Sequence, residues 1–382
     1  MHETSAILEI AALLVAGAFA AVALCVRLGL PPIIGYLAAG VALGPSGLHL
    51  VTEGEALSTL GEVGVILLLF TLGLEFSFAR IVDLRHHIFG LGTLQVAFTG
   101  GIIAGFLLGT QSSGLIAAVL IGGAAAMSST ALCLKTLARE HALQEPQGRL
   151  AISVLLFQDL AAVGLLVVHD AALGQSAAQG LTRFLLGSAG LAAALFLARG
   201  VLQALARWIA SVGDVELAQL LALAISLLSA IAAIMAGLSP ALGAFAAGMM
   251  ISEGDARNVV EKEIRPFRDL LVGFFFVGIG AQLQLETIGD MAPAVLAWLF
   301  VLLAVKLVIV SAIIRLAGEP WPLAWRAGTI LAHGGEFGMM LLSVGAASGL
   351  IDAQLAMPLL LAIGISLFPA TLMIRLGSRS SP

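Results

Sequence analysis

The side chains most able to do chemistry are a few charged residues inside long apolar stretches. Asp159 lies within LLFQDLAAVGLLVV, and Lys306 lies within FVLLAVKLVIVSA. A charged group at such a depth in a membrane is costly and indicates a functional site by default. A buried carboxylate can hold a proton or a metal cation, but not both. Asp159 is therefore predicted to bind a proton and a monovalent cation in competition; the alternative is a carboxylate that caps a helix or pairs with a basic residue.

Neighbouring polar residues are predicted to complete this site. Gln158 precedes Asp159 and offers both a hydrogen-bond donor and an acceptor. Ser128, Ser129 and Thr130 interrupt another apolar run. Hydroxyl and carboxylate oxygens suit potassium and sodium alike, so these residues are predicted to bind the cation or the proton together with Asp159.

Three further ionisable residues are predicted to lie in the same region. Lys306 is predicted to compensate charge, either that of Asp159 or that of helix C-termini; the alternative is a lysine that extends to the membrane surface. Glu336 is either a second carboxylate of the pathway or a partner for a helix N-terminus. His333 titrates near neutral pH and is either a pH sensor or a hydrogen-bonded structural histidine.

An excess of apolar residues decides the class of protein. Of the 382 residues, 60% are hydrophobic and 11% are charged, and the mean hydropathy is +1.08. Soluble proteins average about 45–50% apolar and about 25% charged residues, so lipid must cover the excess. The chain is predicted to be an all-α polytopic membrane protein. Cys25 and Cys133 lack the spacing of a metal site, and no cofactor is expected.

Apolar segments long enough to cross a bilayer follow one another along the chain. A span takes about 17–25 such residues, and about thirteen segments are found. They lie near residues 5–26, 30–48, 58–78, 87–109, 114–137, 149–171, 181–206, 215–236, 238–252, 267–284, 291–315, 323–348 and 354–376. Most of the 18 Lys and Arg residues fall in every second loop. Basic loops stay in the cytoplasm, so the N-terminus is predicted outside and the C-terminus inside.

An internal repeat connects the two halves of the chain. GLPPIIGYLAAGVALG at residues 29–44 matches GLSPALGAFAAGMMIS at 237–252. Nearly the same offset relates the interruptions MSST (127–130) and HGGE (333–336). Paired interruptions in two inverted halves are the best sequence indication of a transport site. We therefore expect one transmembrane domain over residues 1–382, with repeat one at about 5–171, a linking helix at about 181–206 and repeat two at about 215–376.

Several motifs in a fixed order resemble those of the second monovalent cation:proton antiporter family, especially the membrane domain of glutathione-gated potassium-efflux antiporters. They are PPIIGYLAAGVALGPSGL (31–48), GVILLLFTLGLEFS (64–77), SSTA (128–131), FQDL (157–160), IRPFRDLLVGFFFVGIG (264–280) and HGGEFG (333–338). The resemblance implies a homodimer in the inner membrane. Spans 1–3 and 8–10 would form a scaffold, and spans 4–6 and 11–13 would form a moving core with two crossed, discontinuous helices.

The resemblance also implies what is exchanged. Asp159 would be the exchanging carboxylate, and the Gln158-Asp159 pair is similar to the potassium branch of the family. One carboxylate there predicts electroneutral exchange of potassium for protons, both of which are substrates. A cytosolic nucleotide-binding regulatory domain is an implied partner, and the sequence, which ends RLGSRSSP, does not contain one.

Three other functions are weighed against this one. A sodium/proton antiporter uses the same oxygen ligands. A ligand-gated cation channel explains polar breaks, but not an inverted duplication with a lone carboxylate. An intramembrane enzyme needs a nucleophile and a base, and the sequence has no GxSxG motif and no His-rich metal spacing. Without a Walker motif or a nucleic-acid-binding motif, ATP-driven transport and nucleic-acid binding are not expected either.

Overall fold

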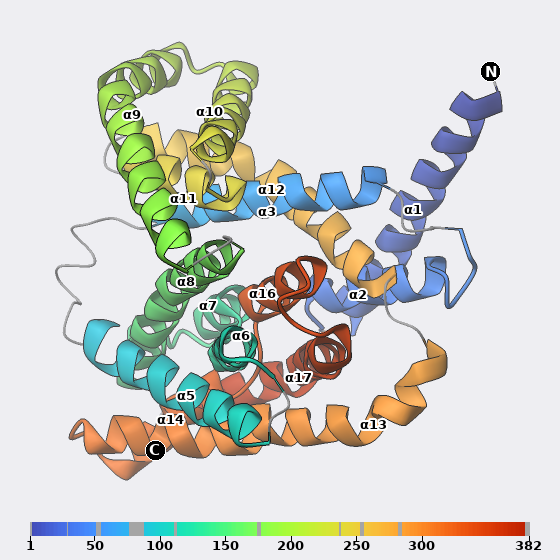
Figure 1. Cartoon of the computed structure of the whole chain (residues 1–382), viewed down its shortest axis with the longest axis vertical. Coiled ribbons are helices and arrows are strands. Elements are labelled where there is room, and N and C mark those ends of the chain that lie inside the picture. Colours follow the sequence, from blue (N-terminus) through green and yellow to red (C-terminus); the bar gives the residue numbers. More distant parts are fainter. Residues whose placement is uncertain are drawn as a thin grey trace. The chain divides into compact units, whose positions relative to one another are not determined.

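The computed structural model is built of helices, and no strand occurs in the residues that it describes (Figure 1). These are residues 2–28, 30–50, 55–75, 88–110, 113–173, 177–236, 238–252, 256–281 and 285–378. The chain divides into two compact units. The first comprises Met1–Val41, Leu84–Leu165 and Leu283–Pro382, and the second comprises Ala42–Asp83 and Leu166–Gln282.

The first unit contains every residue predicted for the site. Its helices are α1 (His2–Arg27), most of α2 (Pro32–Leu43), η1 (Ile88–Gly92), α5 (Thr93–Gly109), α6 (Leu115–Ala126), α7 (Thr130–Arg139), most of α8 (Pro146–Ala172), α13 (Leu285–Phe300), η2 (Val301–Val305), α14 (Lys306–Leu316), α15 (Trp321–Leu331), α16 (Glu336–Ala347) and α17 (Ala353–Ser378). Within it α6 packs against α5, α16 and α17 (Figure 1).

The second unit is a smaller group of packed helices. It contains α3 (Glu55–Glu75), the end of α8, α9 (Ala177–Val212), α10 (Val215–Met235), α11 (Pro240–Ile251) and α12 (Ala256–Ala281). Phe70 and Leu67 of α3 are fully buried, as are Ala244 and Ala247 of α11. The α3–α11 contact therefore joins segments far apart in the sequence.

The expected scaffold and core only partly coincide with these units. Spans 4–6 and 11–13 lie together in the first unit, as the resemblance implies. Residues 2–41, which contain span 1 and most of span 2, also belong to the first unit. The resemblance implied that they would group with spans 3 and 8–10, which lie in the second unit. A packing contact explains part of this difference, because a Cβ atom added at Gly364 of α17 would lie 3.3 Å from the Leu37 side chain of α2.

Each of the expected apolar segments coincides with a helix or with consecutive helices. By length and composition, six of the described helices can cross a membrane, or up to eight if each bent pair is one span. The count of thirteen spans, the orientation and the duplication stay predictions. The loop with Arg80 and Arg85, and residues 253–255, lie outside the described residues.

Helix α12 begins at Ala256, well before the expected span start at residue 267. Charged residues in its first half suggested a loop, but Val260 and Ile264, four residues apart, are both buried. Residues at this spacing share one helix face, so the polar segment forms an amphipathic helix that packs on the core of the second unit.

The predicted membrane environment agrees with the surface of the described helices. Large apolar side chains are widely exposed on them, including Phe106 (69%), Leu197 (80%) and Met235 (84%). Such side chains would be unfavourable in water, whereas lipid tails contact them without cost.

Replacing Gly248 by alanine is expected to destabilise the second unit. A Cβ atom there would meet the backbone oxygen of Phe70, and it would lie 3.0 Å from the Cα atom of Gly73. Overpacking of this kind lowers the free energy of unfolding by about 1–3 kcal/mol. Thermal unfolding of the purified protein in detergent measures the effect. Gly105→Ala is the matched control, because nothing lies within 4 Å of a Cβ atom at that position; equal melting temperatures for the two variants would contradict the prediction.

Candidate functional site

Two interrupted helices meet at the centre of the first unit. Residues 127–129 separate α6 from α7, and residues 332–335 separate α15 from α16, which are bent by 48°. The Ser128 hydroxyl donates a hydrogen bond to the Leu331 carbonyl at 2.8 Å. A Cβ atom at Gly335 would lie 2.5 Å from the Ser128 carbonyl carbon, so only glycine permits this approach. The positions of both interruptions agree with the sequence prediction.

Asp159 lies beside the first interruption. It is on α8 and is 1% exposed. The Thr130 hydroxyl donates to its Oδ1 atom at 3.0 Å. Thr130 is the first residue of α7, and Ser129 caps this helix by accepting from the Leu132 N–H at 3.3 Å. A helix N-terminus has a partial positive charge, which favours an anionic carboxylate nearby. The structure thus brings Asp159, Ser129 and Thr130 together.

Lys306 contacts the C-terminal ends of both interrupted helices. Its ammonium group donates to the Met127 carbonyl at 2.7 Å, just after α6, and to the His333 carbonyl at 2.8 Å, just after α15. Lys306 is 1% exposed and follows the π-helical turn η2. Carbonyl groups at a helix C-terminus have no intrahelical partner and carry partial negative charge. Of the two partners considered for Lys306, these contacts match the helix C-termini.

Lys306 lies where α6 and α15 end, whereas Glu336 lies where α7 and α16 begin. It is the first residue of α16, and the Ala131 N–H in the first turn of α7 points to its Oε1 atom at 3.5 Å. Glu336 is 8% exposed. An acidic group thus faces two helix N-termini, where it is stabilised, and a basic group faces two helix C-termini. Both roles of Glu336, as a partner for a helix N-terminus and as a second carboxylate of the pathway, stay predictions.

His333 is completely buried between the two interruptions. Its Nδ1 atom lies 3.4 Å from the Ser129 nitrogen and 2.8 Å from the Gly334 oxygen, and its Nε2 atom lies 3.4 Å from Cys133 Sγ. A proton on Nδ1 would be donated to Gly334, whereas a proton on Nε2 would leave Nδ1 to accept from Ser129. Either tautomer gives His333 hydrogen-bond partners, as the structural interpretation requires.

Two glutamines connect α5, α8 and the first interruption. Gln158 accepts from the Ser128 N–H at 2.7 Å and donates to Gln95 Oε1 at 2.8 Å. Gln95 in turn donates to the Ala126 carbonyl at 3.1 Å. Gln95 is not among the residues that the sequence predicts for the site. Its signal was a single amide within the apolar run TLQVAFTG, which is weaker than a charge in the same position.

Ser366 is a second residue that the sequence analysis missed. Its hydroxyl accepts from the Gly334 N–H at 2.9 Å and donates to the Ile363 carbonyl at 2.7 Å. The side chain thus satisfies an unwound backbone group of the second interruption. A serine that bonds to its own helix is common, so nothing in the sequence distinguishes Ser366.

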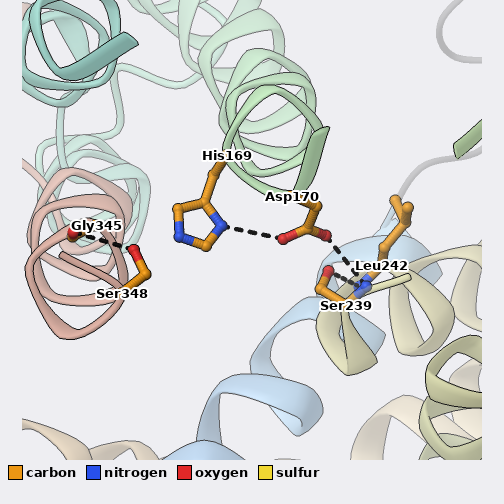
Figure 2. Close-up of polar contacts among 6 residues, drawn as sticks. All are labelled: His169, Asp170, Ser239, Leu242, Gly345 and Ser348. Atoms are coloured by element: carbon orange, nitrogen blue, oxygen red, sulfur yellow. Dashed lines mark hydrogen bonds and ion pairs between the residues drawn. The ribbon is translucent and has the colours of Figure 1, made fainter. Parts of the chain in front are cut away.

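Asp170, a second acid of α8, has a structural role. Figure 2 shows His169 and Asp170 at the end of α8, where the His169 Nδ1 atom lies 3.0 Å from Asp170 Oδ1. Asp170 Oδ2 accepts from the Ser239 N–H at 3.1 Å, and Ser239 Oγ accepts from the Leu242 N–H at the start of α11. Asp170 therefore stabilises a helix N-terminus in the second unit. In the first unit, the Ser348 hydroxyl bonds to the Gly345 carbonyl of its own helix α16.

Solved structures with a similar fold include those of a sodium proton antiporter, MjNhaP1 from Methanocaldococcus jannaschii. One, determined at pH 8, gives a TM-score of 0.67 at 19% identity and covers 99% of this chain and 96% of the other. An electron-microscopy structure gives 0.69 at 16% identity and covers 100% of both chains. At this identity the likeness concerns the fold alone. It confirms the expected all-α membrane fold.

Several relatives have higher identity, at 34–38%. A putative K(+) efflux antiporter KefB of Alkalimonas amylolytica is 38% identical over 91% of this chain and 53% of the relative. Glutathione-regulated potassium-efflux system proteins KefC of Salmonella heidelberg and Klebsiella pneumoniae are each 34% identical, over 94% and 97% of this chain and 58% and 60% of the relative. The chain thus spans between half and two thirds of the length of these relatives.

A protein-family model matches nearly the whole chain and identifies its family. The model described as sodium/hydrogen exchanger, transmembrane, matches residues 10–376. The resemblance to the monovalent cation:proton antiporters is confirmed, and the chain belongs to the transmembrane sodium/hydrogen exchanger family.

Proposed function

We propose that this chain is a secondary antiporter that exchanges a monovalent cation, potassium, for protons by alternating access. The observation that carries the proposal is the buried Asp159 carboxylate, which accepts a hydrogen bond from Thr130 at the interruption between α6 and α7. Unwound backbone inside a membrane is tolerated only where it is buried in protein or lines a cavity. In secondary transporters, substrates and coupling ions typically bind at such interruptions.

Competition at one carboxylate supplies the exchange. When Asp159 is ionised, its oxygens attract a cation, and the Thr130 hydroxyl can turn its lone pairs toward that cation. When Asp159 binds a proton, it no longer attracts the cation. Each crossing of the membrane therefore carries one or the other. Ser128, Ser129 and Gln158 adjoin Thr130 and Asp159 and are the further polar groups of the proposed site; in the structure Gln158 also holds the Ser128 backbone.

The charged groups next to the site keep the two interruptions together. Lys306 neutralises the negative ends of α6 and α15, and Glu336 neutralises the positive ends of α7 and α16. These roles follow from the direction of the helix dipoles. His333 is proposed as a hydrogen-bonded spacer between the interruptions, with pH sensing as the alternative.

Potassium is favoured over sodium by the names of the potassium-efflux relatives and by the Gln158-Asp159 pair. The competing proposal is sodium, which the MjNhaP1 structures and the name of the family favour. We further propose that the chain lies in the inner membrane as a homodimer, with its N-terminus outside, and that its partners include a cytosolic nucleotide-binding regulatory domain. The alternating basic loops support the orientation.

Replacing Asp159 by asparagine is expected to abolish cation-driven proton movement in proteoliposomes. Asparagine keeps the shape and the acceptor for Thr130, but it binds neither a proton nor a cation in exchange. Proton flux after a potassium pulse is the measurement, and Asp352→Asn is the control, because Asp352 is an exposed carboxylate that accepts from the Gln354 N–H. Exchange that persists in Asp159→Asn would show that another group carries the proton.

Replacing Lys306 by methionine is expected to lower the free energy of unfolding by about 2 kcal/mol or more, because two buried carbonyls lose a charged donor. Lys306→Gln retains one amide donor, so its free energy of unfolding should lie between those of Lys306→Met and the unmodified protein. Thermal unfolding in detergent compares them. Lys262→Met serves as the control, because the Lys262 side chain is 82% exposed. A melting temperature for Lys306→Met equal to that of the control would rule out the proposed role.

The exchange is expected to be one for one and therefore insensitive to an imposed membrane potential. Potassium, sodium and rubidium pulses of equal size are compared for the proton flux that each drives, with potassium expected to be the most effective. The same assay is repeated with a clamped potential of either sign. A rate that changes with the potential would refute the stoichiometry, and a current without proton movement would favour a channel.

A further inference from the structure

Gln95 and Gln158 form a chain of hydrogen bonds across the first interruption. Both side chains are 1% exposed. Gln95 Nε2 donates to the Ala126 carbonyl at 3.1 Å and to Thr99 Oγ1 at 3.3 Å. Gln158 Nε2 donates to Gln95 Oε1 at 2.8 Å, and Gln158 Oε1 accepts from the Ser128 N–H at 2.7 Å. The chain therefore begins at the last residue of α6 and ends two residues later on the unwound backbone.

The two ends of this chain determine the direction of both amides. A backbone carbonyl can only accept, so the NH₂ group of Gln95 must face Ala126. Its oxygen then faces Gln158, whose NH₂ group must point back to it. The oxygen of Gln158 is left for Ser128, whose backbone N–H can only donate. Reversing either amide would place two donors or two acceptors against each other, so each glutamine determines the orientation of the other.

We propose that Gln95 is a positioning residue for the cation site, although it lies on α5 and outside every motif of the sequence. This inference rests on the proposed exchange at Asp159. Gln95 fixes the Gln158 amide, Gln158 fixes the Ser128 backbone, and the next residues of that backbone lead to Thr130, which donates to Asp159. Gln95 thus sets where the oxygens of the unwound segment lie relative to the carboxylate, and with that the affinity for the cation.

The same geometry explains why the side chain at position 95 must both donate and accept a hydrogen bond. A protonated glutamic acid there has one O–H, which can donate to the Ala126 carbonyl, and a carbonyl oxygen that can accept from Gln158. An ionised glutamate has no donor, and it would place a negative oxygen against the Ala126 oxygen. Leucine fills a similar volume but makes neither contact.

The test measures the apparent KM for potassium and the maximal rate between acidic and alkaline pH for Gln95→Leu and Gln95→Glu, each relative to the unmodified protein at the same pH. Gln95→Leu should raise the KM about tenfold or more at every pH, because buried groups lose their partners. Gln95→Glu should have a near-normal KM at low pH, where the carboxyl group is protonated, and a KM that rises as the pH rises through its titration.

Gln147→Glu is the matched control. Gln147 is also a buried glutamine of the first unit, and its Nε2 atom donates to the Ser378 carbonyl at 2.9 Å. In Gln147→Glu an ionised carboxylate would also face a backbone carbonyl, so the variant has the same electrostatic repulsion as Gln95→Glu. Gln147 is twelve positions from Asp159 along the chain. Its KM relative to the unmodified protein should not vary with pH. If Gln95→Leu fails to fold, the pH dependence of the KM is measured for Gln95→Glu alone, with that protein prepared at low pH.

Two outcomes separate the inference from the proposed function. Unchanged KM values and pH profiles in both Gln95 variants, or the same pH dependence in Gln95→Glu and Gln147→Glu, would overturn the role of Gln95 while leaving exchange at Asp159 intact. Activity in Asp159→Asn would instead overturn the proposed function. A pH-dependent KM confined to Gln95→Glu, together with a raised KM in Gln95→Leu, supports the inference.

Discussion

The site depends on how the backbone groups of two interrupted helices are satisfied away from water. Each interruption frees carbonyl groups on one side and N–H groups on the other, and in a membrane each unsatisfied group costs several kcal/mol. Lys306 satisfies two of these groups, because its ammonium group donates to both the Met127 and the His333 carbonyl. Because one ammonium group binds both interruptions, they form a single structure.

Neutral side chains from other helices satisfy several of the other backbone groups at the interruptions. Gln95 of α5 and Gln158 of α8 bond to the first interruption, and Ser366 of α17 bonds to the second. The two interruptions also bond to each other through Ser128 and Leu331. Such a network works only if each donor finds an acceptor, so the neutral residues are as constrained as the charged ones.

The sequence predicts the charged residues of this arrangement and the polar residues next to them, but it misses Gln95 and Ser366, for a physical reason. A lone charge in an apolar run is so costly that Asp159 and Lys306 are conspicuous without any structure. An amide or a hydroxyl costs much less, and its partner can be any backbone group, so Gln95 and Ser366 carry almost no signal. The fold shows the same contrast. Apolar runs predict the helices, but the amphipathic start of α12 is hidden by its charges, and the two units draw on both halves of the chain.

Charge balance connects the arrangement to the proposed exchange. Lys306 and Glu336 have opposite charges and face opposite helix ends, so together they add little net charge to the pair of interruptions. The net charge of the site is then set by Asp159 and by whatever it binds. A proton and a potassium ion each bring one positive charge, so both loaded states of the proposed carrier have the same net charge. A second carboxylate at position 158 would take up a second proton, and the proton-loaded state would then have one positive charge more than the potassium-loaded state. The glutamine there takes up no proton, so it preserves the equality and still satisfies the unwound backbone.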